Sequence, residues 1–153
     1  MTRVALDTNI LAYLAGVSRG AADEGKIAAV RELVARLSPS VSFIAPTQTI
    51  GELFVVLLRG GATAAEARAV ILEFADTFGT AASAIDTARA AVDLAVDHQF
   101  QYWDALILTA AAEAGCSMLL SEDMQDGFVT RGLTIINPLT DDVHPKLQAL
   151  AGK

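Results

Sequence analysis

Short runs of aliphatic and β-branched residues alternate along the chain with longer segments in which apolar residues recur at every third or fourth position. Short continuous apolar runs are typical of buried strands, and the longer periodic segments predict amphipathic helices. Residues 18–25 are polar and predict a loop. The predicted strands are residues 3–6, 41–46, 80–84, 117–121 and 133–138, and the predicted helices are residues 8–16, 26–38, 48–59, 64–78, 87–99 and 102–114.

This alternation of strands and helices indicates the fold class. Strands joined through helices form right-handed crossovers and a mostly parallel sheet that is covered on both faces. We therefore predict an α/β protein, a three-layer α/β/α sandwich with a mostly parallel central sheet. Residues 1–140 are expected to form one domain, and the polar segment 141–153 a peripheral C-terminal tail.

The composition excludes several classes of protein. With 153 residues, of which 53% are hydrophobic and 19% charged, the chain is long and apolar enough to bury a core. No apolar run reaches the roughly 20 residues that span a bilayer, and Asp7 and Asn9 interrupt the first apolar segment. We therefore expect a cytoplasmic protein with no membrane association. The single cysteine, Cys116, excludes an internal disulfide, and neither histidine has a neighbour at zinc-ligand spacing.

The net charge is −7, from 11 Lys and Arg against 18 Asp and Glu. An acidic protein is not an obvious binder of nucleic acid, because that affinity comes largely from neutralised phosphates. Carboxylates gathered around bound cations would reverse the local field. The placement of the acids therefore matters more than their number.

Two acids stand next to predicted strands. Asp7 follows the strand 3–6, and Asp123 comes just after the strand 117–121, at the edge of a parallel sheet where ligands bind. Asp7 also suits the ordinary role of a helix N-cap, and residues 121–127 suit the ordinary role of a solvated acidic turn.

Two further acids lie in apolar helices. Glu52 is the only charged residue of IGELFVVLL, a helix that we expect to be buried, and Arg59 is about 10 Å away along the helix axis. A buried carboxylate without a partner is costly, which favours a functional role for Glu52. Asp104 lies in the first turn of its helix, where complementarity to the helix dipole offers an alternative explanation.

Together these four acids suggest a metal centre. Four clustered carboxylates cannot all stay ionised without compensation, and oxygen ligands without His or Cys select Mg²⁺ or Mn²⁺. The chemistry that fits is metal-assisted cleavage of phosphodiesters, in which the cation activates water and neutralises charge at phosphorus. We therefore expect one cage of carboxylates from Asp7, Glu52, Asp104 and Asp123.

Four pieces of the sequence, LDTNIL, GEL, YWDALIL and LLSEDMQDG, resemble PIN-domain ribonucleases in their order and approximate spacing. More narrowly, they resemble the VapC-type toxins of bacterial toxin–antitoxin pairs. The resemblance covers residues 3–138. It implies that the catalytic and metal-binding acids are Asp7, Glu52, Asp104 and Asp123.

The resemblance also implies an activity and partners. It implies endonucleolytic cleavage of RNA with Mg²⁺ or Mn²⁺, and a homodimer inhibited by a small VapB-like antitoxin whose C-terminal segment covers the catalytic groove. Ser121 matches the small hydroxyl residue before the last acid, and Asp126 is an auxiliary candidate carboxylate. For Asn9 we expect a helix-cap role, with orientation of a ligand or phosphate as the alternative.

Two other interpretations remain open. A haloacid dehalogenase-like phosphatase also begins with a strand followed by Asp, but that family has a second Asp where this chain has Asn9. It also needs a cation, usually Lys, and the chain has no Lys between Lys26 and Lys146. The other alternative is a non-catalytic module that uses the PIN scaffold only for binding, against which the presence of all four acids argues.

An acidic ribonuclease also needs positive charge to hold the rest of its RNA. Surface solubility is the ordinary role of such residues, and the sequence does not place them in space. The candidate cations are Arg3, Arg19, Lys26, Arg59 and Arg131.

Overall fold

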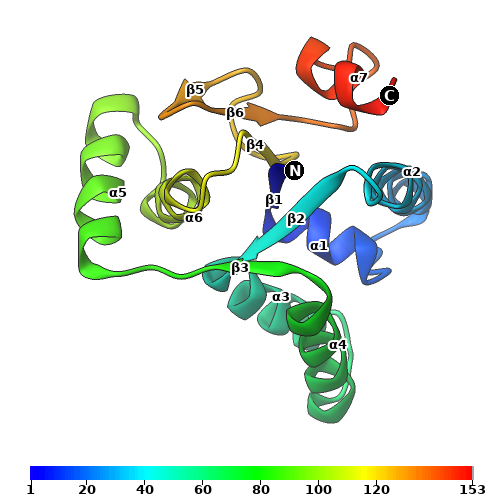
Figure 1. Cartoon of the computed structure of the whole chain (residues 1–153). Helices are drawn as coiled ribbons and strands as arrows, with labels where there is room; N and C mark the ends of the chain where they lie inside the picture. The colour runs from blue at the N-terminus through cyan, green and yellow to red at the C-terminus, as the bar shows by residue number, and fades with distance from the viewer. Residues whose placement is uncertain (153) are drawn as a thin grey trace.

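The central sheet has six strands in the order β3-β2-β1-β4-β6-β5 (Figure 1). The computed structural model describes residues 1–152. The strands from β3 to β6 run parallel to their neighbours, and β5 runs antiparallel to β6. The strands are β1 (Thr2–Leu6), β2 (Val41–Pro46), β3 (Gly79–Ala81), β4 (Met118–Leu120), β5 (Val129–Thr130) and β6 (Leu133–Ile136).

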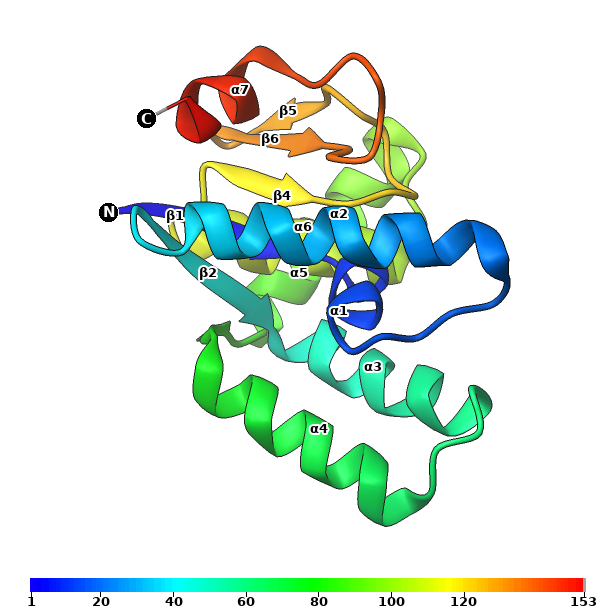
Figure 2. The ribbon, with the colours of Figure 1, turned by 90° about the vertical axis from the view of Figure 1, so that its right-hand side faces the viewer.

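Helices cover both faces of this sheet, which confirms the predicted α/β/α sandwich. Helices α5 and α6 lie on one face, and α1, α2 and α7 lie on the other (Figures 1 and 2). Helices α3 and α4 pack on each other beside β2 and β3. Within residues 1–152, no helix is both long and apolar enough to cross a bilayer. The helices are α1 (Thr8–Leu14), α2 (Ala21–Leu37), α3 (Thr47–Arg59), α4 (Ala64–Thr77), α5 (Ile85–His98), α6 (Tyr102–Glu113) and α7 (Pro145–Ala151).

Successive residues of β1 belong to two separate cores, because side chains alternate between the faces of a strand. Val4 and Leu6 pack with residues of α1, α2 and α3, whereas Ala5 packs with residues of α5 and α6. All three side chains are fully buried. Burial on both faces explains why the central strands are continuous apolar runs rather than alternating ones.

The five predicted strands are present, although β3 ends at Ala81. The predicted loop at residues 18–25 is wrong in its second half, because α2 begins at Ala21. Asp23 and Glu24 lie in the first turn of α2, where negative charge complements the helix dipole, so these polar residues start a helix instead of forming a loop.

Two elements have no counterpart in the predicted set. Strand β5 has only two residues, and α7 lies in the polar segment that was expected to be a peripheral tail. Leu147 of α7 is buried, and α7 contacts α2. The division into a domain of residues 1–140 and a tail of residues 141–153 stays a prediction.

Helix α5 ends at a residue with an unfavourable backbone conformation. Gln99, its C-cap, has φ 60° and ψ 35°, in the left-handed region that favours glycine, and its side chain is exposed. We expect Gln99→Gly to raise the free energy of unfolding by about 0.5–1 kcal/mol, since relief of this strain exceeds the added freedom of the unfolded chain. Urea denaturation measures the change. Gln99→Ala is the matched control, because it removes the side chain but keeps the strain, and a similar gain from both variants would contradict this explanation.

Candidate functional site

Parallel pairing of β1 with β4 brings two distant segments of the chain together at the carboxyl edge of the sheet. Leu6 pairs with Leu120 in this register, so Asp7 and Ser121, the residues that follow, lie side by side. The Ser121 hydroxyl donates a hydrogen bond to Asp7 Oδ2 at 2.7 Å. Both side chains are buried, Asp7 at 4% exposure and Ser121 at 0%.

Asp7 caps a helix and also belongs to the acidic site. Its Oδ1 accepts a hydrogen bond from the backbone N–H of Thr8 at 2.7 Å, as expected for the N-cap of α1. Burial raises the pKa of Asp7 from its ordinary value of 3.8 to about 6, although the hydrogen bonds from Ser121 and Thr8 oppose the shift. The nearby charges of Asp104 and Glu52 make smaller contributions to the same rise. The cap role therefore does not exclude a functional one.

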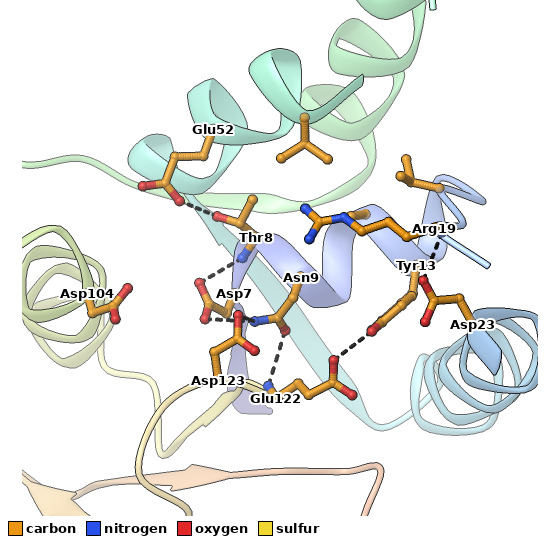
Figure 3. Close-up of a pocket in the computed structure, with 13 residues that line it drawn as sticks. Asp7, Thr8, Asn9, Tyr13, Arg19, Asp23, Glu52, Asp104, Glu122 and Asp123 are labelled. Carbon is orange, nitrogen blue, oxygen red and sulfur yellow. Dashed lines mark hydrogen bonds between the residues drawn. The ribbon is translucent and has the colours of Figure 1, made fainter. Parts of the chain in front are cut away.

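Glu52 reaches the same site from α3 (Figure 3). The hydroxyl of Thr8 donates to Glu52 Oε2 at 2.5 Å, and Gln48 Nε2 donates to Oε1 at 3.1 Å. One oxygen of Glu52 is thus held by the residue next to Asp7, and the other by a residue one turn earlier on its own helix. These two bonds fix the direction in which the carboxylate points.

The prediction that the helix carrying Glu52 is buried is wrong. Of α3, only Thr49, Leu53 and Leu57 are buried, and Val55 and Leu58 are 43% and 39% exposed. One face of α3 packs on the core while the opposite face is open. Glu52 lies between the two and is half-buried, so its desolvation is milder than the sequence suggests.

Asp104 faces this group from the other side of the cleft, in the first turn of α6 (Figure 3). Burial raises the pKa of its carboxyl, and repulsion from Glu52 and from Asp123 raises it further. Asp104 is therefore close enough to the other acids to be coupled to them. Asp104 also lies where the helix dipole favours negative charge, so the dipole offers an additional reason for an acid at this position.

Asn9 connects the acids that follow β1 and β4. Its Nδ2 lies 3.3 Å from Asp7 Oδ2 and 3.2 Å from Asp123 Oδ2, and its Oδ1 accepts a hydrogen bond from the backbone N–H of Glu122 at 3.2 Å. The predicted helix-cap role of Asn9 is wrong, because Asp7 already caps α1. The side chain of Asn9 instead holds two carboxylates at a common edge.

The loop after β4 is shaped by Ser121. Its hydroxyl oxygen accepts hydrogen bonds from the backbone N–H groups of Asp123 at 3.3 Å and Met124 at 3.2 Å. Asp126 turns elsewhere, since its Oδ1 accepts a hydrogen bond from the backbone N–H of Asn137 at 2.9 Å and it does not line the cleft. The structure therefore places Ser121 beside the acids and Asp126 outside the cleft.

These side chains line one cleft of about 380 Å³, a size typical of small-molecule sites. Asp7, Glu52, Asp104 and Asp123 all contribute to its surface, together with two more acids near its opposite end. The structure thus places the four acids predicted from the sequence on the surface of one cavity. The single basic residue that lines it is Arg19, within the part of the chain that the structure describes.

A second polar cluster at this cleft has no counterpart in the sequence analysis. Glu122 accepts a hydrogen bond from the Tyr13 hydroxyl at 2.6 Å and pairs with Lys26 Nζ at 2.8 Å. Burial, followed by the bond to Glu122, raises the pKa of Tyr13 to about 12. The three residues tie α1 and α2 to the loop that carries Asp123. These three residues are far apart in the sequence, so no local pattern indicates that they form a cluster. The contact of Gln48 with Glu52 could have been predicted, because residues four apart lie on the same face of a helix.

The donor set of the cleft suits a hard cation, because it offers carboxylate oxygens without His or Cys. Within residues 1–152, however, no three Asp, Glu, His or Cys side chains lie close enough together to hold a metal ion directly. The four acids therefore do not form the expected cage. Mg²⁺ commonly keeps several waters and binds through one or two carboxylates plus substrate phosphates. Burial, and to a smaller extent repulsion from neighbouring acids, raises the pKa values of Asp7 and Asp104, and a bound cation would favour their ionised forms. The residues present therefore fit a hydrated divalent cation.

Residues 4–126 match the PIN domain family, and this segment contains all four acids. The chain belongs to the PIN domain family. No significant match to a curated protein was found.

Solved PIN-domain structures confirm the fold of the chain. VapC20 of Mycobacterium tuberculosis, described as a toxin that cleaves the sarcin-ricin loop, is 18% identical, with a TM-score of 0.62 over 78% of this chain and 91% of that one. A toxin–antitoxin complex from Klebsiella pneumoniae is 19% identical, with a TM-score of 0.63 over 88% and 97%. VapBC2 from Rickettsia felis, bound to a DNA fragment from its promoter, is 12% identical, with a TM-score of 0.62 over 80% and 89%.

Proposed function

We propose that this PIN protein is a Mg²⁺- or Mn²⁺-dependent endoribonuclease and the toxin of a toxin–antitoxin pair. The observation that carries the proposal is that four carboxylates, from the end of β1, from α3, from α6 and from the loop after β4, line one cleft. Membership of the PIN domain family supports nuclease chemistry at this cleft. The similar fold of VapC20, a toxin that cleaves the sarcin-ricin loop, supports RNA as the substrate.

Asp7, Glu52, Asp104 and Asp123 would hold the cation. When bound there, it would activate water and neutralise the charge that develops at phosphorus during cleavage. The surrounding residues keep the acids in place: Ser121 orients Asp7, and Thr8 orients Glu52. Other neighbours have the same positioning role, namely Gln48 toward Glu52 and Asn9 toward Asp123.

We also propose that a VapB-like antitoxin inhibits the protein and that the protein forms a homodimer. The antitoxin is supported by the assemblies in which two structures of the same fold were solved, the VapBC2 complex and the toxin–antitoxin complex from Klebsiella pneumoniae. Thr8, Asn9, Ala12 and Tyr13 of α1 line the cleft, so a peptide segment that lies along α1 would cover the acids.

The proposal is tested with purified protein, a fluorescent single-stranded RNA of random sequence, and Mg²⁺, Mn²⁺ or EDTA. We expect cleavage with either cation and none with EDTA. Asp104→Asn should lower the cleavage rate by about 100-fold or more, because loss of a metal ligand should cost at least as much as loss of an outer partner, for which about 10- to 100-fold is typical. The control is Asp93→Asn, which neutralises an exposed acid on α5 that does not line the cleft.

Three outcomes would contradict the proposal. Equal cleavage rates for Asp104→Asn and the wild type would show that the acids of the cleft do not take part in the cleavage as proposed. Binding of Mn²⁺ without cleavage of any RNA would favour a non-catalytic module. Hydrolysis of a small phosphate monoester without RNA cleavage would favour a phosphatase.

A further inference from the structure

Most of the basic residues considered for RNA binding already have an ion pair or a hydrogen bond within the protein. Lys26 pairs with Glu122, and Arg131 lies 3.8 Å from the carboxylate of Glu113. Arg3 donates a hydrogen bond to the carbonyl of Ala114 at 2.7 Å, at the end of the molecule opposite to the acids. The positive charge or the donors of these side chains are therefore already used within the protein.

Arg19 differs from them in both position and pairing. It lines the acidic cleft, and Figure 3 shows its guanidinium extending from the loop after α1 back over the cleft toward Asn9. Within residues 1–152, its guanidinium makes no ion pair and no hydrogen bond. Its backbone is anchored, because the N–H of Arg19 donates to Asp23 Oδ2 at 2.9 Å. A fixed backbone thus presents an unpaired cation to a site rich in carboxylates.

The surface next to Arg19 is apolar. Ala12 and Val17 from α1 and the following loop, and Val56 from α3, line the same end of the cleft. Ala12 lies five residues beyond Asp7, about 7 Å along the axis of α1, which is more than the size of one phosphate group. The cleft therefore has one end with the four predicted acids and a second end where Arg19 and an apolar wall lie beside Asp23 and Glu122.

We infer that this second end, formed by Arg19, Ala12, Val17 and Val56, is a subsite for the nucleotide next to the scissile phosphate. The guanidinium of Arg19 binds the phosphate of that nucleotide, for which its planar fork of donors is well suited. The apolar wall contacts the sugar or base, which are less polar than the phosphate. The inference rests on the proposed function, since it says where the nucleotide next to the cleaved phosphate lies in the same cleft.

The chemistry of the cleft favours this occupant. An RNA strand entering a site with six acidic side chains needs positive charge near each phosphate that no metal neutralises. Arg19 supplies that charge from the loop after α1, and its guanidinium can bind a phosphate while the carboxylates hold the metal ion. Arg19 is accordingly a substrate-positioning residue.

The test compares wild type with Arg19→Met on two substrates in Mn²⁺: single-stranded RNA of ten random nucleotides, and bis(p-nitrophenyl) phosphate, a diester that has no neighbouring phosphate for Arg19 to bind. We expect kcat/KM for RNA to fall about 10-fold, through KM, and hydrolysis of the small diester to be unchanged. The slope of log affinity for RNA against log salt concentration should become shallower by about 0.7, as expected for the loss of one contact to a single strand. Arg36→Met, an exposed arginine on α2 that does not line the cleft, is the matched control.

The outcomes separate this inference from the function on which it rests. Equal RNA binding by wild type and Arg19→Met, measured in an Asp104→Asn background to prevent cleavage, overturns the subsite whether or not the wild type is a nuclease. Equal losses on both substrates also overturn it, because Arg19 would then act at the reacting phosphate or on folding. Failure of the wild type to cleave either substrate, with RNA binding that still depends on Arg19, overturns the nuclease function and leaves the subsite supported.

Discussion

Replacement of Asp7 by asparagine should abolish RNA cleavage and at the same time make the metal-free protein more stable. We expect the cleavage rate to fall by two to three orders of magnitude, a loss typical of removing one strong electrostatic contact to a reacting centre. The free energy of unfolding in EDTA at pH 7 should rise by about 1–3 kcal/mol. A residue whose loss ends activity but strengthens the fold is under a functional constraint.

The gain in stability follows from the raised pKa of Asp7. Burial raises this pKa from 3.8 to about 6, so the folded state binds a proton more tightly than the unfolded state. Asp7 therefore lowers the free energy of unfolding as the pH rises from about 4 to about 6, and the full penalty applies above pH 6. Asparagine is neutral at every pH and removes this pH dependence. Its carbonyl can still accept the capping hydrogen bond from the N–H of Thr8.

Urea denaturation in EDTA at pH 5 and pH 7 measures this effect, with Asp93→Asn as the control for removal of an exposed charge. The gain from Asp7→Asn should be larger at pH 7 than at pH 5. Addition of Mn²⁺ should stabilise the wild type and have a smaller effect on the variant, since a ligand stabilises only the state that binds it. A variant that is less stable than the wild type at pH 7, or one that cleaves RNA normally, would refute this role for Asp7.

The sequence predicts the central part of the fold because local pattern and tertiary structure agree there. Continuous apolar runs become β1, β2, β4 and β6, which are buried on both faces. Because these strands are parallel, their carboxyl ends share one edge, and Asp7 and Asp123 come together there. The positions of these acids could therefore be inferred from their order along the chain.

Contacts between elements account for what the sequence does not predict. The bond from Thr8 to Glu52 joins residues 44 positions apart, and the bond from Tyr13 to Glu122 joins residues 109 apart. Leu147 lies in a polar segment without a clear helical pattern, and its burial depends on α2. In each case the decisive partner is distant in the chain, so no local pattern marks it.

The overall composition also does not predict the charge of the cleft. The net charge of −7 applies to the whole surface, whereas the cleft concentrates six acids and one arginine. Two of these acids, Asp7 and Asp104, have raised pKa values, mainly because they are buried and in smaller part because neighbouring acids repel them. The local field, and not the net charge, determines which ligands enter.

Ser121→Ala should have the opposite effect on stability from Asp7→Asn, although both lower activity. The Ser121 hydroxyl donates to Asp7 and accepts from the N–H groups of Asp123 and Met124, at a fully buried position. Its removal leaves a buried carboxylate without one of its two closest donors, which should lower the free energy of unfolding by about 2–3 kcal/mol. Cleavage should fall about 10- to 100-fold, as for other partners that orient a metal-binding residue.

Ser117, before the start of the same strand, is the matched control for this prediction. Its hydroxyl oxygen is buried and has no hydrogen-bond partner within residues 1–152, so Ser117→Ala should be neutral or stabilise by up to about 1 kcal/mol. A double-mutant cycle then isolates the contact between Ser121 and Asp7. If the serine acts by supporting an ionised carboxylate, Ser121→Ala should cost at least about 1 kcal/mol less in the Asp7→Asn background than in the wild type. An equal cost in both backgrounds would show that Ser121 stabilises only the loop after β4, and its loss of activity would then be a consequence of that loop moving Asp123.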